Sequence, residues 1–112
     1  MEESILVTIK KLLGIAKEYN NFDLDIITHI NTVFMTLNQL GVGPSEGFSI
    51  EDDSATWNEY ISDSTKFNAI KTYIYLKVKI VFDPPLSSAV MEATKQSINE
   101  LEWRLNVESE SK

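Results

Sequence analysis

Cysteine is absent from the 112 residues of this chain, and histidine occurs once, at His29. The absence of cysteine excludes a disulfide framework, a thiolate metal site and a thiol nucleophile. A lone histidine with no metal-ligand partner near it in the sequence is typical of a packing or surface residue. Asp52 and Asp53 lack the spacing of a calcium loop, and the glycines that begin at Gly41 precede no Lys-Ser or Lys-Thr pair of a phosphate loop. We therefore find no catalytic constellation and expect no enzyme activity, no metal and no cofactor.

Long apolar runs are absent as well. No run approaches the roughly 20 residues that a membrane-spanning helix needs, and residues 1–10 lack the basic-then-apolar order of a secretory signal. We therefore expect synthesis in a cytoplasm and no contact with a membrane. A chain of 112 residues fits one compact domain, which buries roughly two thirds of the surface that its unfolded form exposes.

Positive charge is scarce and unevenly distributed. The chain has 10 Lys and Arg against 17 Asp and Glu, a net charge of -7. Residues 18–63 contain nine carboxylates and no Lys or Arg, whereas residues 66–79 contain four lysines and no acid. Because binding to nucleic-acid phosphates requires cations clustered on one face, this segregation argues against general nucleic-acid binding. The simplest interpretation is an acidic surface that keeps the protein in solution.

Helical periodicity appears in the first third of the chain. Residues 2–13 carry a narrow apolar stripe and end before Gly14, which is a plausible stop. A longer helix begins near Asp23, which we expect as its N-cap, with Phe22 packed on Ile27 as a hydrophobic staple. This second helix ends at Gly41 and has one broad apolar face.

A long exposed loop is predicted for residues 41–54, which contain three of the four glycines and one of the three prolines. Long loops in small domains are usually functional or mobile. Its acids are Glu46, Glu51, Asp52 and Asp53. A capping box at residues 56–59 then predicts a short helix with two aromatic side chains and an isoleucine on one side, and Asp63 or Ser64 is a cap candidate for the next segment.

Residues 66–82 fit two secondary structures. Apolar residues alternate with Tyr73, Tyr75, Lys77 and Lys79, as in a half-buried strand. The same segment also carries an apolar stripe at helical spacing, and its length of about 17 residues favours a helix, since strands usually run three to ten. Periodicity alone leaves both alternatives open.

A rigid bend is predicted at Asp83, Pro84 and Pro85. Pro84 pushes the residue before it out of the helical region, and neither proline supplies an amide to continue a helix. Ser87 or Ser88 can then cap a last helix over residues 89–105. Trp103 lies off the apolar stripe of that helix, so its ring is available for a second packing surface or for a partner.

Several stretches together resemble the phage head-tail connector, or adaptor, family of tailed bacteriophages and prophages. They are YLKVKIVFDPPLSS followed by a helix ending in ELEWRLNV, then FMTLNQLGVGP, GFSIED and the short Trp-containing helix at residues 57–61. The resemblance covers residues 24–107. It implies an all-α bundle of four to five helices, with a helix at residues 66–82, in a single domain 1–112 with a flexible tail at 108–112.

The resemblance also implies a function. A connector of this family is a structural virion protein that forms a ring, dodecameric in the virion, at the head-tail junction. Its implied partners are further copies of itself, the portal protein and a tail-side stopper or completion protein, and DNA passes through its channel without sequence-specific binding.

Two sets of residues are candidates for the contacts of such a ring. Aromatic residues are enriched at protein interfaces, so Trp57, Tyr60 and Trp103 are candidate contacts, although each can equally belong to the core and Trp57 fits the core better. An acidic wall would repel DNA and keep it moving. We therefore expect the loop that carries the four acids named above to face the channel or a neighbouring ring.

A different class of function fits the same physical features. A small acidic helical regulator or inhibitor that binds one cytoplasmic protein would have the same composition and helix pattern. Light scattering of the chain alone and mixed with the matching portal protein distinguishes the two hypotheses.

Overall fold

A computed structural model describes residues 3–61 and 66–110, which form five helices and no β-strand. The helices are α1 (Ile5–Leu13), α2 (Asp23–Gln39), α3 (Trp57–Tyr60), α4 (Phe67–Phe82) and α5 (Ser88–Glu110). The expectation of a small all-α bundle is confirmed, and the strand alternative for residues 66–82 is wrong. The cap candidates Asp63 and Ser64 lie outside the described residues.

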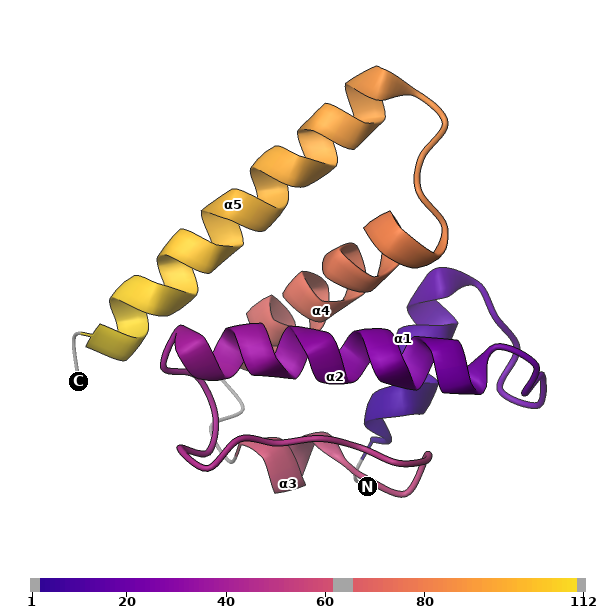
Figure 1. The fold of residues 1–112 in the computed structure, drawn as a ribbon, viewed down its shortest axis with the longest axis horizontal. Coiled ribbons are helices and arrows are strands. Elements are labelled where there is room, and N and C mark those ends of the chain that lie inside the picture. The colour runs from indigo at the N-terminus through magenta and orange to yellow at the C-terminus, as the bar shows by residue number, and fades with distance from the viewer. Residues whose placement is uncertain (1–2, 62–65, 111–112) are drawn as a thin grey trace.

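Helix α4 lies at the centre of the bundle and packs against α1, α2 and α5 (Figure 1). Its fully buried side chains are Ile70, Tyr73, Ile74 and Val78, at helical spacing. A helix that is apolar on most sides requires neighbours on most sides, and three other helices meet that requirement. The alternation that suggested a strand therefore reflects a central helix that packs against three neighbouring helices.

The ends of α1 follow the sequence signals. Ser4 is the N-cap, and its Oγ accepts a hydrogen bond from the Val7 amide at 3.2 Å. Gly14 ends the helix with φ 83°, and its amide donates to the Lys11 carbonyl at 3.1 Å. The left-handed conformation at this position is the one that glycine adopts without strain.

The start of α2 differs from the prediction. Phe22 is the N-cap and makes no side-chain capping bond, while Asp23 is the first helical residue. The Asp23 carboxylate instead forms an ion pair with the buried Nζ of Lys10 at 2.9 Å. Phe22 therefore does not occupy the position before the cap that a staple requires, and its ring packs edge-on against Phe82 with centroids 5.3 Å apart.

The bend before α5 forms as expected. Helix α4 ends with Asp83 as its C-cap, and Ser87 Oγ accepts a hydrogen bond from the Val90 amide at 3.3 Å, which makes Ser87 the cap of α5. Helix α5 runs on to Glu110, past the predicted end at residue 105. Tyr73 of α4 holds it by donating a hydrogen bond from its hydroxyl to Glu102 Oε2 at 2.7 Å. Burial, together with this bond, raises the pKa of Tyr73.

Candidate interaction surfaces

The loop between α2 and α3 crosses beneath α2 and turns back before α3 (Figure 1). It is anchored at the buried Ile50, whose amide donates to Asn31 Oδ1 at 2.8 Å and whose carbonyl accepts from Asn31 Nδ2 at 2.9 Å. The three residues after this anchor, Glu51, Asp52 and Asp53, are all exposed. We call them the acidic tip.

The acidic tip has a defined local conformation. Asp52 Oδ1 accepts hydrogen bonds from the amide of Ser54 at 2.8 Å and from its hydroxyl at 2.6 Å. These bonds favour the ionised carboxylate and hold the pKa of Asp52 below its usual value. The tip is therefore negatively charged at neutral pH, and hydrogen bonds within the subunit hold its conformation.

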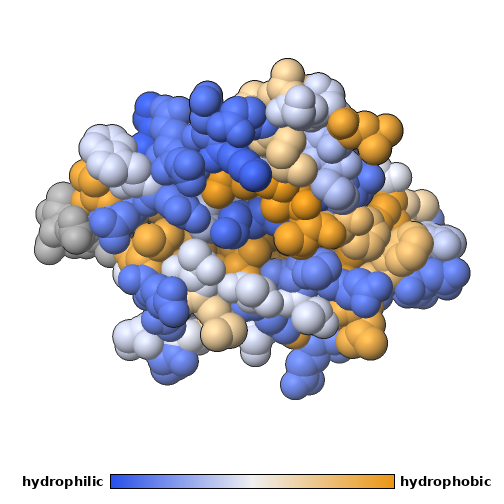
Figure 2. Space-filling model, turned by 45° about the horizontal axis from the view of Figure 1, so that its top comes forward, coloured by the Kyte–Doolittle hydropathy of each residue, from blue (hydrophilic) through white to orange (hydrophobic). Residues whose placement is uncertain are grey.

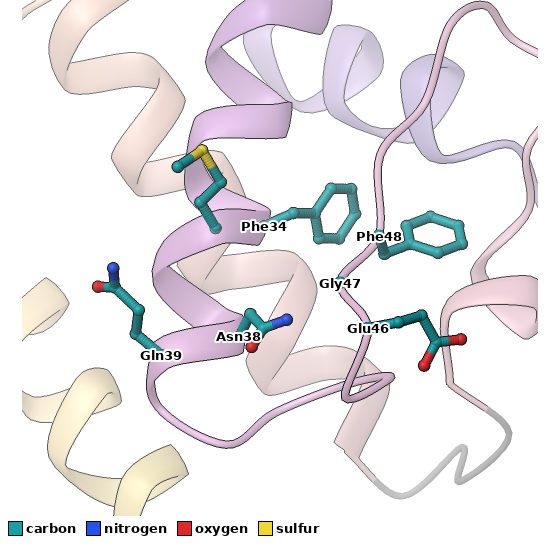
Figure 3. A pocket seen from close by; sticks show the side chains of 7 residues that line it. Phe34, Asn38, Gln39, Glu46, Gly47 and Phe48 are labelled. Carbon is teal, nitrogen blue, oxygen red and sulfur yellow. The ribbon is translucent and has the colours of Figure 1, made fainter.

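Glu46 lies in a different part of the same loop. It is exposed and lines a shallow pocket of about 290 Å³ between α2 and the loop (Figure 3). Phe34 from α2 and Phe48 from the loop approach each other there, with ring centroids 5.2 Å apart. The structure thus brings three of the four predicted acids together at the tip and places Glu46 beside this pocket.

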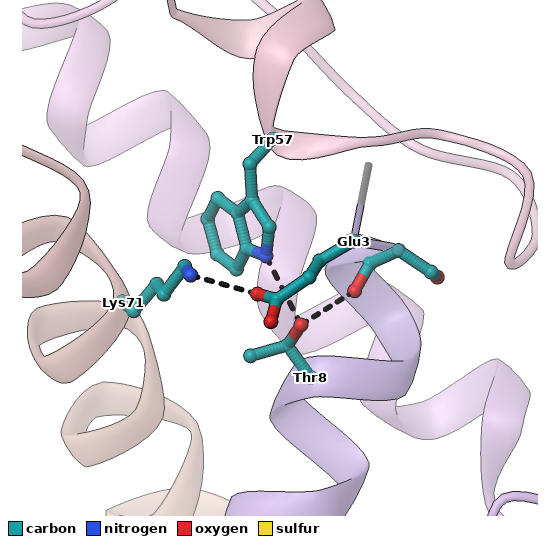
Figure 4. A network of polar contacts seen from close by, with 5 residues as sticks. Glu3, Thr8, Trp57 and Lys71 are labelled. Atoms are coloured by element: carbon teal, nitrogen blue, oxygen red, sulfur yellow. Dashed lines mark hydrogen bonds and ion pairs between the residues drawn. The ribbon is translucent and has the colours of Figure 1, made fainter. Parts of the chain in front are cut away.

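Trp57 is buried, with 1% of its surface exposed. Its Nε1 donates to Thr8 Oγ1 at 3.1 Å, and Lys71 Nζ lies 5.5 Å from the ring centroid (Figure 4). Lys71 also binds Glu3 Oε1 at 2.8 Å, and this hydrogen-bonded cation holds the pKa of Glu3 below its usual value. The indole of α3 therefore contacts α1 through Thr8 and α4 through Lys71. Trp57 occupies a core position, which is one of the two alternatives that the sequence left open.

Tyr60 is also part of the core, with 3% of its surface exposed. Its ring centroid lies 4.6 Å from that of Phe34 and 5.2 Å from that of Phe48, and its hydroxyl donates to the Val42 carbonyl at 3.4 Å. Burial raises the pKa of the phenol. In this structure neither Trp57 nor Tyr60 presents its ring at the surface.

Trp103 is placed differently. It is 66% exposed on α5, beside a shallow pocket of about 340 Å³ that includes Ala69, Leu101 and Leu105. Of the three predicted aromatic contacts, it is the one whose ring a partner can reach. Exposed aromatic rings next to apolar hollows are a common feature of protein interfaces.

Other apolar side chains also reach the surface. On the face shown in Figure 2, a band of hydrophobic residues lies between two hydrophilic regions. Across the described chain, five large hydrophobic residues other than Trp103 are more than half exposed: Leu24, Met35, Val81, Leu86 and Val90. Contiguous exposed apolar surface commonly marks a site of protein association.

Sequence reasoning missed a groove between α1 and α4. It has a volume of about 680 Å³, and Lys11, Lys17 and Lys71 line it together with Val7 and Leu12. Helix packing brings these lysines together from positions as far apart as 11 and 71. No sequence motif signals such a cluster.

Neither a metal site nor a membrane span emerges in the part of the chain that the structure describes. Among residues 3–61 and 66–110, no three His, Asp or Glu side chains are arranged to hold a metal ion. None of the helices in the same ranges combines the length and the apolar character that crossing a membrane would require. His29 is partly buried on α2.

A protein-family model described as "Phage connector protein" matches residues 5–112. The chain belongs to the phage connector protein family. No curated protein and no solved structure matches it. As a connector, it is a structural component of the virion that interacts with other phage head and tail proteins. The match includes α1, which lies outside the stretches that carried the resemblance in sequence.

Proposed function

We propose that this connector is one subunit of a ring, dodecameric in the virion, that lies between the capsid portal and the tail and encloses the channel for DNA. Its neighbours at the head-tail junction are the portal protein and a tail-side stopper or completion protein. The observation that carries the proposal is the family match over residues 5–112, which spans all five helices and the acidic loop.

The exposed surface supports ring formation. A closed ring requires a heterologous interface, in which one patch of a subunit meets a different patch of the next. Trp103 and the other exposed hydrophobic residues supply apolar area that a neighbouring subunit or the portal would cover. Trp57 and Tyr60 contribute indirectly, because they fix the loop and α3 to the bundle.

The charge of the loop supports passage of DNA without tight binding. Each cation that pairs with a phosphate adds salt-dependent affinity, which would hold a genome that has to slide. We propose that part of the loop containing Glu46, Glu51, Asp52 and Asp53 faces the channel or a neighbouring ring. All four side chains are exposed, and the tip carries three adjacent carboxylates.

Light scattering of the purified connector, alone and mixed with the matching portal protein, tests the ring. We expect a ring, or a complex with the portal that contains several connector subunits. A monomer in isolation is compatible with assembly that needs the portal as a template. A connector that stays monomeric and ignores the portal would refute the proposal and would favour the regulator hypothesis.

Charge reversal tests the loop. We expect the double variant Asp52→Lys, Asp53→Lys to slow genome ejection or to impair virion assembly, because it replaces two exposed negative charges with positive ones. Plaque assays and ejection kinetics on phage carrying the variant measure both effects. The matched control is Glu18→Lys, Glu92→Lys, which changes the net charge equally at exposed positions outside the loop. Unchanged infectivity of the loop variant would refute the proposal that the loop faces the channel or a neighbouring ring.

A further inference from the structure

Five of the nine Lys and Arg in the described residues are ion-paired within the subunit. Five ion pairs join described residues: Lys10 with Asp23, Lys71 with Glu3, Lys77 with Glu102, Lys79 with Asp83, and Arg104 with Glu100. Lys11, Lys17 and Lys95 form no ion pair with another described residue. Lys11 acts on Glu3 at longer range, where its charge contributes to the lowered pKa of that carboxyl. The three cations outside ion pairs belong to a chain with a net charge of -7, so their location is informative.

Two of these three cations lie in the groove between α1 and α4. Lys11 and Lys17 line it together with Lys71, and Glu3 is the one carboxylate in its lining. The volume of about 680 Å³ is within the range of sites that hold a small ligand or a short peptide segment. We call this surface the cationic groove, and its lining carries three positive charges against one negative charge.

The chemistry of the cationic groove selects an acidic ligand with some apolar character. The lysine ammonium groups attract carboxylates or phosphates, while Val7 and the 46% exposed Leu12 offer apolar contact. Duplex DNA is a poor fit, because it binds proteins through extended cationic faces rather than through a local group of three lysines in an acidic subunit. The apolar residues in the lining favour a protein segment.

This connector carries such a segment. The acidic tip is exposed and follows a fixed anchor at Ile50. It is not seated in the groove of its own subunit, because its three side chains are exposed and none of them lines the groove. The tip and the groove are therefore both available to another copy.

We propose that the acidic tip of one subunit docks into the cationic groove of the next. The proposal rests on the ring proposed above and identifies one of its contacts. It assigns the tip to the next subunit and leaves Glu46 as the acid of the loop that faces the channel or a neighbouring ring. Subunits that each carry a net charge of -7 repel one another unless patches of opposite charge meet. Because tip and groove are different patches, their pairing is heterologous, which is the type of contact that can close a ring.

Charge exchange tests this contact. The variants are Lys11→Glu, Lys17→Glu in the groove, Asp52→Lys, Asp53→Lys in the tip, and the combination of all four. We expect each double variant to weaken assembly by at least about tenfold, since attraction becomes repulsion, and the combined variant to recover most of the loss. Light scattering across a concentration series at about 50 mM and 500 mM salt, alone and on the portal, provides the measurement. Wild-type assembly through this contact weakens at the higher salt.

Single substitutions provide a matched control. Lys17→Glu and Lys95→Glu each reverse one exposed lysine without an ion pair to described residues, but only Lys17 lines the groove. We expect Lys17→Glu to weaken assembly and Lys95→Glu to leave it near the wild-type value. Circular dichroism checks that both variants are folded. We expect that they are, because surface substitutions usually change stability little.

The possible outcomes separate this contact from the ring itself. If the wild type assembles and the groove variants assemble equally well, the contact is wrong and the ring stands. If the groove variants fail but the combined variant is not rescued, the groove binds a different acidic partner and the pairing is wrong. Normal assembly of the tip variant with slow genome ejection would also overturn the pairing and assign the tip to the channel. A wild type that forms no assembly, alone or with the portal, overturns the ring and the contact together.

Discussion

Gly43 shows at the scale of one residue how tightly the loop is fitted to the bundle. Its φ is +87°, and a Cβ built on it would lie 2.6 Å from Cε1 of Tyr60. The Tyr60 ring has little room to move, because Phe34 and Phe48 pack against it. Glycine is therefore required here for two reasons, the left-handed backbone and the close approach of an aromatic ring.

We predict that Gly43→Ala destabilises the fold by about 2–4 kcal/mol, the sum of backbone strain and overpacking. The matched control is Gly14→Ala, where φ is +83° but nothing lies within 4 Å of the added Cβ. The control isolates the strain alone, which costs about 1 kcal/mol. Urea unfolding followed by circular dichroism measures both. Equal losses for the two variants would show that the Tyr60 ring shifts without cost.

At the scale of helices, a buried ion pair fixes how α1 meets α2. Lys10 has 2% of its side chain exposed, and its Nζ lies 2.9 Å from Asp23 Oδ1 and donates to the Lys17 carbonyl at 3.1 Å. Asp23 Oδ1 is buried and makes no aligned hydrogen bond among the described residues, so the attraction is mainly between charges. The Asp23 side chain as a whole is 27% exposed, so the carboxylate is better solvated than the Lys10 ammonium.

This difference in solvent exposure predicts that the loss of stability depends on which partner is replaced. Asp23→Asn leaves the Lys10 ammonium buried without its counter-charge, and we expect it to cost about 3 kcal/mol. Lys10→Met keeps an apolar side chain of similar length in place and leaves a partly solvated carboxylate, so we expect about 1 kcal/mol. Urea unfolding of both variants gives the comparison. A larger loss for Lys10→Met would mean that the Lys10 hydrogen bond to Lys17, rather than the ion pair, provides the stability.

The helices were predictable where the signals are local. Ser87 as a cap, Gly14 as a stop and the bend at Pro84 depend on neighbouring residues, and all three appear in the structure. Asp23 has the residue type of an N-cap but was misassigned, because its carboxylate binds a lysine from another helix. Residues 66–82 were undecided because a helix surrounded by other helices loses the polar face that marks a helical period.

The candidate interaction surfaces were predictable only in part. The acidic tip is contiguous in sequence, so its composition was visible, and Trp103 was identified by its position off the apolar stripe. The burial of Trp57 and Tyr60 depends on contacts with Thr8 and Val42, 49 and 18 residues away. The cationic groove depends on the packing of α1 against α4, which composition and periodicity do not determine.

At the scale of the whole molecule, α5 is the helix that the bundle covers least. It packs mainly on α4 (Figure 1). Within its described side chains only Ile98 and Leu105 are buried. Asn106 adds one bond, from its Nδ2 to the Leu40 carbonyl at 3.3 Å. A long helix with most of its surface uncovered has area available for a neighbouring subunit or for the portal, and Trp103 is its largest exposed apolar side chain.

We therefore predict that Trp103→Ser leaves the stability of the isolated subunit within about 1 kcal/mol of the wild type, since the ring is 66% exposed. The same change should weaken assembly on the portal by about 2 kcal/mol, or roughly thirtyfold, as expected for a tryptophan that a partner covers. Leu105→Ala is the matched control on the same helix, because its buried side chain should cost about 2–5 kcal/mol of stability. Urea unfolding and titration with the portal separate the two effects. If Trp103→Ser assembles like the wild type, the contacts of α5 lie elsewhere on its surface.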